Sequence, residues 1–348
     1  NSIVYDSANQ KVVIAYRDNA NSYYGTAIVG TVSGTSISFG DPVVFNSDDS
    51  RYIDVVSIGN GKVVVVYRDD GNSYKGTAIV GTISGTSISF GAESEFNSNA
   101  GNWNSVTYDS TNDKVVIAYT DTGNSSRGYA IVGTVSGTSI SFGSEVQFES
   151  GTSVEHSATF DSTNGKVVIA YLDNSNSDKG TAVVGTVSGN SISFGTPVIF
   201  NNATTENVTA TFDSANGKVV IAYTDNGNSW YGTAIVGTVS GTSISFGSEV
   251  VYESASTSEN SIVYDSYIEK VVITYRDEGN SSYGTVIVGT VSGTSISFGS
   301  AVVYESANTA AQAASYDIWN QKVVIGYRDS GNSNYATAIV TTASSTTL

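Results

Sequence analysis

The chain has 348 residues and a formal net charge of -17, with 15 Lys and Arg against 32 Asp and Glu. It contains no cysteine, no methionine and a single histidine, His156. These counts exclude disulfide scaffolds, thiolate metal sites and thiol nucleophiles. The acidic balance argues against a phosphate-backbone partner, and no apolar run approaches the ~20 residues that span a bilayer. We therefore expect no nucleic-acid partner and no membrane insertion.

An internal repeat covers the whole sequence. Every copy contains Tyr-x-Asp, at a spacing of 51 residues once and then of 52 residues, with the tyrosines at Tyr16, Tyr67, Tyr119, Tyr171, Tyr223, Tyr275 and Tyr327. Seven copies leave no room for a second domain. We place them at residues 1–50, 51–100, 101–150, 151–202, 203–254, 255–306 and 307–348.

Each copy is predicted to contain extended segments, and copy five serves as the example. Its strands are predicted at 207–213, 218–225, 232–240 and 243–246. The second is rich in β-branched and aromatic residues, as buried strands are. A Gly/Asn/Ser turn at 226–229 separates the second strand from the third, and an apolar stretch at 249–252 continues outward before the next copy. No segment has the spacing of an amphipathic helix, so the chain is predicted to be all-β.

Four antiparallel strands in each repeat of about 52 residues predict one blade of a β-propeller. We therefore expect a single seven-bladed β-propeller over residues 1–348, with an open β-solenoid as the alternative. Copies one to six contain Ser-Ile-Ser-Phe-Gly, but copy seven runs into Ser344–Leu348 without it. Either residues upstream of Asn1 or the segment Ser344–Leu348 is expected to supply the missing outer strand. We expect the natural polypeptide to extend beyond this chain.

Sequence differences between copies concentrate in two segments, the loop after the second strand and the connector into the next copy. In an up-and-down blade both emerge on one face, whereas the nearly constant turns emerge on the other. The varying segments gather aromatic residues, Arg and Asn, which are typical of recognition surfaces, although loops also drift without selection for binding. The candidate ligand-binding residues are Tyr23, Tyr24, Tyr52, Trp103, Arg127, His156, Trp230, Tyr231, Tyr283 and Tyr335.

A repeated Asp begins each loop after the second strand, at Asp18, Asp69, Asp121, Asp173, Asp225, Asp277 and Asp329. The loops Asp69–Tyr74 and Asp225–Trp230 resemble the Asp-box hairpin, Asp-x-Gly-x-x-aromatic, of sialidases and other propellers. In such hairpins the Asp side chain accepts backbone N–H groups of its own turn, so the predicted role is structural. Calcium binding is the alternative for this Asp-x-Gly-Asn-Ser pattern. We expect no other metal or cofactor.

No catalytic site emerges from the sequence. Four arginines, Arg17, Arg68, Arg276 and Arg328, occupy one repeat-equivalent position, which indicates blade geometry rather than a converging sialidase-like cluster. Paired carboxylates for glycoside hydrolysis cannot be nominated, because the acids recur by repeat. Glu155 and His156 are predicted to be a solvated loop pair. We expect a protein that is not an enzyme.

The repeat unit, Tyr-Asp-Ser-x-Asn-x-Lys-Val-Val-Ile-Ala-Tyr-x-Asp through Ser-Gly-Thr-Ser-Ile-Ser-Phe-Gly, resembles the tandem repeat of virion-associated, tail-fibre-like proteins of marine bacteriophages, cyanophages especially. This resemblance implies a virion-surface or extracellular location and a binding or structural role. The predicted function is a recognition or adhesion module that binds a host-surface glycan or another surface ligand. The alternatives are a structural spacer that packs on other virion or surface proteins, and a glycan-active enzyme.

Overall fold

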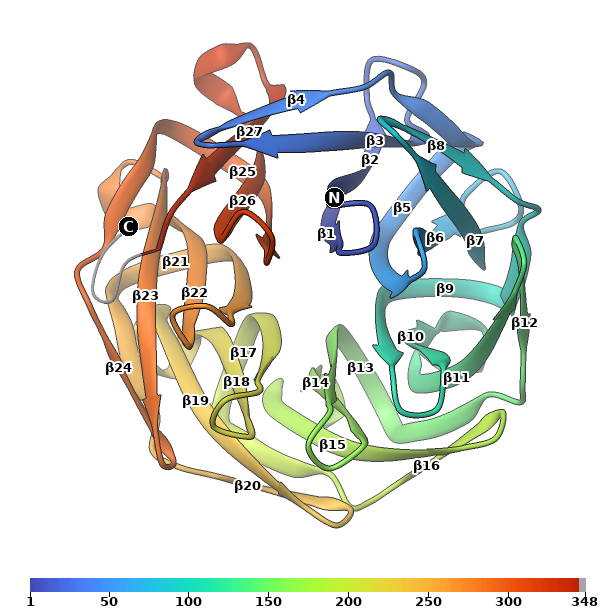
Figure 1. Cartoon of the computed structure of the whole chain (residues 1–348). Coiled ribbons are helices and arrows are strands. Elements are labelled where there is room, and N and C mark those ends of the chain that lie inside the picture. Colours follow the sequence, from blue (N-terminus) through green and yellow to red (C-terminus); the bar gives the residue numbers. More distant parts are fainter. Residues whose placement is uncertain (344–348) are drawn as a thin grey trace.

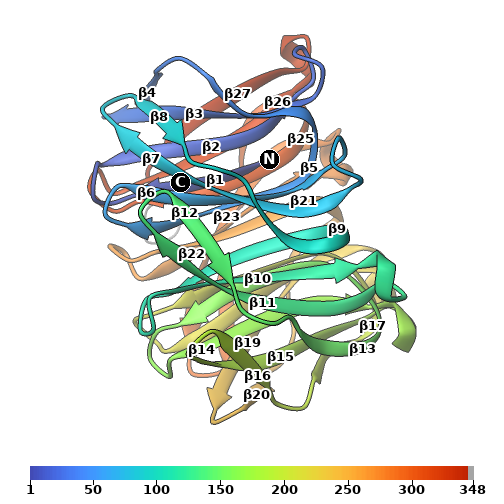
Figure 2. The same ribbon diagram turned by 90° about the vertical axis from the view of Figure 1, so that its right-hand side faces the viewer.

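The computed structural model describes residues 1–343, which contain 27 β-strands and five short 3-10 turns. Every pairing between these strands is antiparallel. Figure 1 shows the sheets arranged around a central opening, and Figure 2 shows their edges from the side. The all-β class is confirmed, and the architecture is a propeller-like ring of repeated antiparallel units.

The central strands of each copy follow the repeat closely. The second strands are β2 Lys11–Asp18, β6 Lys62–Asp69, β10 Lys114–Asp121, β14 Lys166–Asp173, β18 Lys218–Asp225, β22 Lys270–Asp277 and β26 Lys322–Asp329. The third strands are β3 Tyr24–Ser33, β7 Lys75–Ser84, β11 Arg127–Ser136, β15 Lys179–Ser188, β19 Tyr231–Ser240, β23 Tyr283–Ser292 and β27 Tyr335–Thr341. The second strands are apolar on both faces because each sheet packs against a neighbour on either side.

The outer and inner strands are linked differently from the prediction. The short fourth strands are β4 Ser36–Phe39, β8 Ser87–Phe90, β12 Ser139–Phe142, β16 Ser191–Phe194, β20 Ser243–Phe246 and β24 Ser295–Phe298. Long strands follow them: β5 Val43–Gly59, β9 Ser94–Asp109, β13 Val146–Asp161, β17 Val198–Asp213, β21 Val250–Asp265 and β25 Val302–Asp317. The first strand of the chain is β1 Ser2–Asp6.

Each long strand belongs to two copies, which the sequence did not predict. The first half of β21 pairs with β19, with Val250 opposite Ala234, and completes the outer edge of copy five. The second half pairs with β22 as the inner strand of copy six. Most of the apolar stretch at 249–252 is therefore part of the sheet, since β21 begins at Val250, which pairs with Ala234. The predicted first strand at 207–213 is likewise only the second half of β17.

An aromatic pair fills the junction between successive copies. A ring from the outer edge of one copy packs against the Tyr-x-Asp tyrosine of the next, with ring centroids 5.1 to 5.3 Å apart. The pairs within residues 1–343 are Phe45–Tyr67, Phe96–Tyr119, Phe148–Tyr171, Phe200–Tyr223, Tyr252–Tyr275 and Tyr304–Tyr327. A glycine on the third strand makes room for each ring. At Gly25, for example, a Cβ would lie 2.3 Å from Cε2 of Phe45.

Side chains also join the inner strands around the central opening. Ser and Asp side chains on one inner strand accept a backbone N–H from the inner strand of the next copy. These bonds are Val106 N to Asp54 at 2.8 Å, Ala158 N to Ser105 at 3.0 Å, Ala210 N to Ser157 at 2.9 Å and Ala314 N to Ser261 at 3.1 Å. They fix the relative height of neighbouring copies, and therefore the positions of the loops that rise from them.

The first and last copies meet at a junction that we call the seam. Apolar packing closes the seam, through buried Ile3, Val12 and Val32 on one side and Val324 and Val340 on the other. Within residues 1–343, β27 pairs only with β26, and β1 only with β2. The prediction that Ser344–Leu348 supplies an outer strand for copy seven lies outside the described residues.

Candidate functional site

The loops after the second strands and the crossing points of the long strands lie together, on a surface that we call the variable face. Backbone bonds join them: the N–H of Ser50 donates to the carbonyl of Tyr23 at 3.2 Å, and that of Thr257 to Trp230 at 3.0 Å. The same bond links Gly101 to Tyr74. The shared face predicted for these two segments is therefore what the structure shows.

The loops of the variable face share one backbone conformation, in which non-glycine residues adopt positive φ angles. In copy five, the 3-10 turn η3 Asn226–Asn228 is followed by two left-handed residues, Ser229 at φ 58° and Trp230 at φ 60°. The same turn occurs at η1 Thr122–Asn124, η2 Asn174–Asn176, η4 Glu278–Asn280 and η5 Ser330–Asn332. Non-glycine residues in this region need support from surrounding hydrogen bonds. The side chain at the loop tip is therefore held on a backbone of fixed conformation.

The repeated Asp residues provide most of that support. Asp225 accepts the N–H of Gly227 at 3.0 Å, and Asp329 accepts those of Gly331 and Asn332 at 2.8 and 3.2 Å. Asp173 differs, because it makes no bond to the backbone of its loop and accepts instead from the hydroxyl of Ser175 at 2.6 Å. The carboxylates are thus already engaged within the protein, and among residues 1–343 no three His, Asp or Glu side chains form a group suited to a metal ion.

Asp225→Ala is expected to lower the free energy of unfolding by about 1 to 2 kcal/mol, because it removes the bond to Gly227 and leaves the buried amide of Asn201 without its acceptor. Asp173→Ala is the matched control, since Asp173 is equally buried at 7% exposure against 6% for Asp225. Its expected loss is smaller, at about 0.5 kcal/mol. Urea unfolding of both variants tests the difference, and equal losses would contradict the backbone-capping role.

An arginine–aromatic cluster occupies the variable face over copies one to three. Its members are Arg17, Tyr23, Asp49, Arg51, Tyr52, Arg68, Asp70, Tyr74, Asn102 and Trp103. The rings of Tyr52 and Trp103 lie 5.1 Å apart, and the guanidinium of Arg68 lies 5.0 Å from the Tyr52 ring centroid. Arg17 lies 3.9 Å above the ring of Tyr23. Such contacts hold both the arginines and the rings in defined orientations.

Carboxylates connect the arginines of this cluster into one network. Asp49 accepts from Arg17 at 2.6 Å and from Arg51 at 3.1 Å, while Asp70 contacts Arg51 at 3.0 Å and Arg68 at 2.6 Å. The hydrogen bond from Arg17 is the main reason that the pKa of Asp49 is lowered. The network therefore presents fixed donors and acceptors beside exposed rings, which is the chemistry that recognises hydroxyl groups.

The structure places the predicted aromatic residues unevenly. Trp230 is 52% exposed, Tyr23 44% and Trp103 37%, so all three offer ring surface to solvent. Tyr24, Tyr52, Arg127, Tyr231 and Tyr283 are half-buried. Tyr335 is 65% exposed, because the described part of copy seven has no strand outside β27. The structure brings Tyr23, Tyr52 and Trp103 into the arginine–aromatic cluster, whereas Trp230 lies in copy five, outside it.

The prediction of a solvated Glu155–His156 pair was wrong. His156 is 8% exposed and packs edge-on against Phe148. Its Nδ1 donates to the carbonyl of Trp103 at 3.0 Å, and its Nε2 accepts from Ser153 at 3.1 Å. Burial lowers the pKa of His156 to about 4 and raises that of Glu155 to about 7. His156 thus lies beneath the variable face, where it supports the backbone of Trp103 instead of meeting a ligand.

A cavity of about 710 Å³ opens on the variable face at the seam. Arg17, Arg51 and Tyr52 line one side of it, and Arg328 and Tyr335 line the other. The cavity therefore continues the arginine–aromatic cluster around to copy seven. Sequence reasoning assigned Arg17, Arg68 and Arg328 to blade geometry, and it did not identify Asp49 as the partner of Arg17 or Asp70 as the partner of Arg68. The usable signal was the Asp-x-Arg spacing of Asp49 and Arg51.

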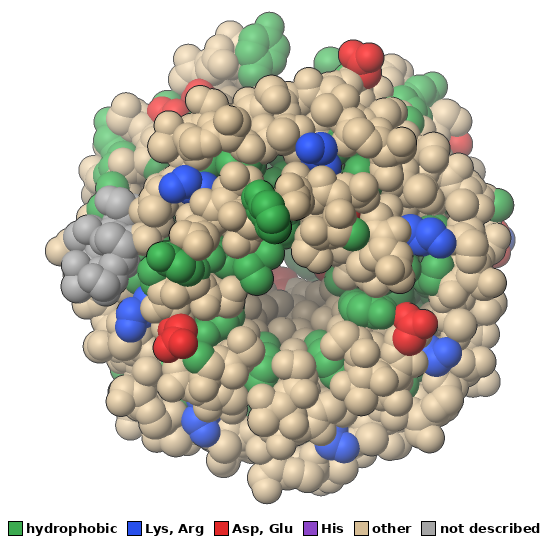
Figure 3. Space-filling view, viewed as in Figure 1, with side chains coloured by type: hydrophobic (Ala, Val, Ile, Leu, Met, Phe, Trp, Pro, Cys, Tyr) green, Lys and Arg blue, Asp and Glu red, His purple; other side chains and the backbone are tan. Residues whose placement is uncertain are grey.

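The opposite face has a different character. Figure 3 shows a view along the axis of the ring in which Lys and Arg side chains lie singly around a hollow centre, without gathering into a basic patch. Of the exposed aromatic residues, Tyr267 and Trp319 lie in the turns between long and second strands, at 64% and 67% exposure. Trp319 is therefore an exposed tryptophan far from the arginine–aromatic cluster.

In the described part of the chain there is no helix with the length and apolarity needed to cross a membrane.

Comparisons with known proteins identify the fold. No family model matches the chain, and no curated protein matches it in sequence. The solved structure of the BP39L lectin from Burkholderia pseudomallei is similar over 100% of this chain and 96% of its own, with 9% identity and a TM-score of 0.73. A Lactobacillus plantarum protein is similar over 87% and 84%, with 12% identity and a TM-score of 0.60. Sqt1 from Chaetomium thermophilum, solved with the N-terminus of a ribosomal protein, covers 94% and 84%, with 11% identity and a TM-score of 0.57. At these identities the comparisons establish the propeller-like fold.

Proposed function

We propose that this protein is a non-enzymatic glycan-recognition module built on a seven-bladed β-propeller. Each sequence copy supplies one blade of up to four antiparallel strands, and each long strand runs from the outer edge of one blade into the inner strand of the next. The variable face binds the ligand. The arginine–aromatic cluster is the observation that carries this proposal, because it combines exposed rings with oriented hydrogen-bonding groups.

The chemistry of the cluster suits a sugar ring. A pyranose has an apolar face of C–H groups that stacks on tyrosine or tryptophan, and Trp103 and Tyr52 present adjoining rings for this contact. Its hydroxyl groups would then meet the carboxylates of Asp49 and Asp70 and the amide of Asn102, which already bonds to Arg68 at 2.7 Å. Paired donors and acceptors at fixed positions give orientation, while the stacked rings give most of the buried area.

Two further observations support the proposal. The BP39L structure, similar over the full length of this chain, is that of a lectin. The repeat architecture spaces similar loops around a ring, so several weak sites could engage one multivalent surface and gain avidity. We extend the proposal to a virion-surface or extracellular setting, of the kind found in tail-fibre-like phage proteins, in which host-surface glycans are the ligands and other surface proteins the partners.

Trp103→Ala is expected to reduce glycan binding about fivefold to thirtyfold, because removing one stacking ring costs on the order of 1 to 2 kcal/mol. A glycan array first identifies the ligand, and isothermal titration with that glycan measures the change. Trp319→Ala is the matched control, since Trp319 is more exposed but lies outside the variable face. Trp230→Ala separates the cluster from a site in copy five.

The outcomes decide between distinct roles. Loss of binding in Trp103→Ala with full binding in Trp319→Ala supports the cluster as the glycan site. Equal binding in wild type and Trp103→Ala would reject the cluster. Binding to no glycan, with the variable face covered in the intact assembly, would instead favour the structural spacer.

A further inference from the structure

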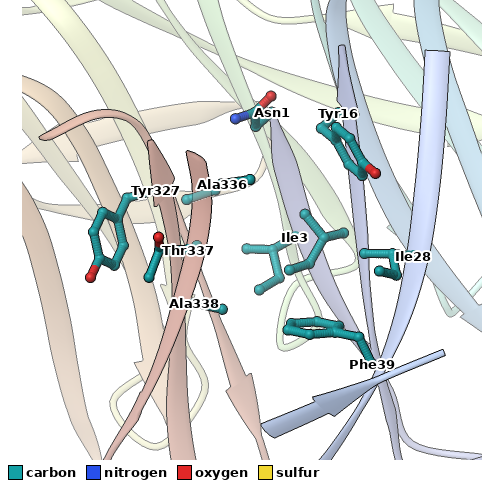
Figure 4. A pocket seen from close by; sticks show the side chains of 12 residues that line it. Asn1, Ile3, Tyr16, Ile28, Phe39, Tyr327, Ala336, Thr337 and Ala338 are labelled. Atoms are coloured by element: carbon teal, nitrogen blue, oxygen red, sulfur yellow. The ribbon is translucent and has the colours of Figure 1, made fainter. Parts of the chain in front are cut away.

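The described residues enclose space of two kinds. An apolar cavity of about 220 Å³ lies at the seam, where Ile3, Ile28 and Phe39 point into it (Figure 4). Apolar walls offer a water molecule no hydrogen bonds, whereas buried polar atoms without partners bind water where there is room for it. Space of this second kind lies beside Gly101, two residues before Trp103 in β9.

Two asparagines of β9 are buried without the hydrogen bonds that buried amides need. Asn97 is 4% exposed and Asn104 is 8% exposed. The Nδ2 of Asn97 and both polar atoms of the Asn104 side chain have no hydrogen-bond partner within residues 1–343. Leaving a buried polar atom unpaired is costly in free energy. These three atoms therefore indicate a partner that is not a group of the protein.

At the preceding junction, between copies one and two, a hydroxyl group is the partner of the first asparagine. Asn46 corresponds there to Asn97, and its Nδ2 donates to the hydroxyl of Ser50 at 3.1 Å. The residue that corresponds to Ser50 between copies two and three is Gly101, which has no side chain. Asn97 therefore lacks the hydroxyl that Asn46 has, and the place of a serine side chain is left beside it.

The same hydroxyl group also serves the residue that corresponds to Asn104 in other copies. In copy four that residue is His156, whose Nε2 accepts from the hydroxyl of Ser153 at 3.1 Å. In copy seven it is Gln312, whose Nε2 donates to the hydroxyl of Thr309 at 3.0 Å. Copies two and five have an apolar residue at this position, Ile53 and Val208. Copy three instead combines a buried amide with a glycine that offers no hydroxyl.

The aromatic ring at this junction cannot supply a hydroxyl either. At the junction between copies five and six, the ring belongs to Tyr252, whose hydroxyl donates to Oδ1 of Asn260 at 3.0 Å. The corresponding ring beside Asn104 is Phe96. Both kinds of hydroxyl group that satisfy this position elsewhere are therefore replaced in copy three by residues without one.

The backbone around Gly101 leaves room where the hydroxyl lies in other copies. At Gly128 on β11, an added Cβ would lie 2.6 Å from the hydroxyl oxygen of Ser153, whereas at Gly76 on β7 the three nearest atoms all belong to an aromatic ring. A Cβ added to Gly101 would lie 3.0 Å from Cα of Gly76 and 3.6 Å from Oδ1 of Asn104. The space is thus no larger than a small side chain, and a polar atom of Asn104 borders it.

We propose that one buried water molecule occupies this space as part of the folded structure. It accepts a hydrogen bond from Nδ2 of Asn97 and exchanges one with the amide of Asn104. It also donates to the carbonyl of Asn99, as the hydroxyl of Ser50 donates to the carbonyl of Asp48 at 3.3 Å. Three polar partners are the usual number for a buried water, and a water of this kind is costly to remove.

The water links residues on both sides of a segment that belongs to the arginine–aromatic cluster. Asn97 precedes Asn102 and Trp103 in β9, and Asn104 follows them. A water bound to both amides therefore holds this bulged part of the strand from below, where the register shifts against β10. The water site does not depend on the proposed glycan function, because its polar atoms are buried and no ligand is needed to test it.

A crystal structure of the wild-type protein tests the site directly. We expect electron density for one water about 2.7 to 3.2 Å from Nδ2 of Asn97 and from the amide of Asn104. Gly101→Ser is expected to replace this water with its own hydroxyl and to raise the melting temperature by about 1 to 3 °C, because an immobilised water is released. A wild-type map without density at this place would overturn the proposal.

Gly101→Ala is the matched control, since it adds the same Cβ without a hydroxyl. It displaces the water but leaves both asparagines unpaired, so we expect the melting temperature to fall by about 2 to 5 °C. Melting of Gly101→Ser above wild type and of Gly101→Ala below it would support the proposal. Equal melting temperatures of the two variants would overturn it, because the space would then be dry and a methyl group would fill it as well as a hydroxyl does.

Discussion

Gly284→Ala is expected to lower the free energy of unfolding by about 2 to 3 kcal/mol, because the added methyl group overpacks a filled junction. Its Cβ would lie 2.6 Å from Cε2 and Cζ of Tyr304 and 2.9 Å from Cγ2 of Thr309. These atoms belong to a partly buried ring that packs against Tyr327 and to a fully buried threonine, so neither can move without displacing its neighbours. Urea unfolding followed by circular dichroism measures the change.

The chain contains its own control for this effect. Ala336 occupies the same repeat position in copy seven, where it is exposed. Ala336→Gly is therefore expected to change the free energy of unfolding by no more than about 1 kcal/mol, the usual cost of glycine in a strand. Similar losses at both positions would mean that glycine is kept in the repeat for a reason other than the aromatic ring.

Glu155→Gln is expected to make the stability of the protein fall by about 2 to 3 kcal/mol between pH 6.5 and pH 4.5, relative to wild type, as the pH is lowered. The reason is that Glu155 and His156 have pKa values shifted in opposite directions by burial, to about 7 and about 4. Each pKa unit corresponds to about 1.4 kcal/mol. In the wild type, the pH dependence of stability that Glu155 causes opposes the one that His156 causes between pH 4.5 and pH 6.5.

The direction follows from which protonation state folding favours. Glu155 has a raised pKa, so its contribution is complete below its ordinary pKa of 4.5 and is lost as the pH rises through about 7. His156 has a lowered pKa, so its contribution is complete above 6.5 and is lost as the pH falls through about 4. Glu155→Gln removes the contribution of Glu155, so only the loss of stability due to His156 remains as the pH falls.

Urea unfolding at several pH values between 4.5 and 6.5 tests this expectation. Glu206 is the other carboxylate that acts on Glu155, and it raises the pKa of Glu155 further. Glu206→Gln is therefore the control, expected to shift the profile only slightly. Parallel profiles for wild type and Glu155→Gln would contradict the opposed pair.

Much of the fold could be predicted because every copy of the repeat has the same pattern of strand-forming and turn-forming residues. Lys218–Asp225 and Ser243–Phe246 were predicted with the bounds that the structure has, since turn residues delimit them on both sides. The long strands were missed because nothing in the sequence at Ser256 or Thr257 marks the point where β21 changes partners. A strand that continues from one sheet into the next has the same local pattern as two strands joined by a short loop.

The sequence predicted which face of the ring carries the candidate site, but not which residues form it. Comparing the copies locates the loops that vary, but it does not show which of them meet in space. Trp103 lies in a connector and Trp230 in a loop after a second strand, and both segments vary between copies. Yet only Trp103 has an aromatic neighbour among the ring contacts of the described residues. His156 was misplaced because a polar residue in a connector looks solvated, whereas here a left-handed Glu155 turns the chain and buries the imidazole.

The way the ring closes has a consequence for its motions. Within residues 1–343, the seam is held by five buried apolar side chains, whereas the junction between copies one and two buries thirteen. In a repeat protein each interface contributes separately to stability, so the ring should open first where its interface is smallest. Backbone amides of β27 would then exchange with solvent before those of β23, and the protein would sample an open arc while most of its sheets stay folded.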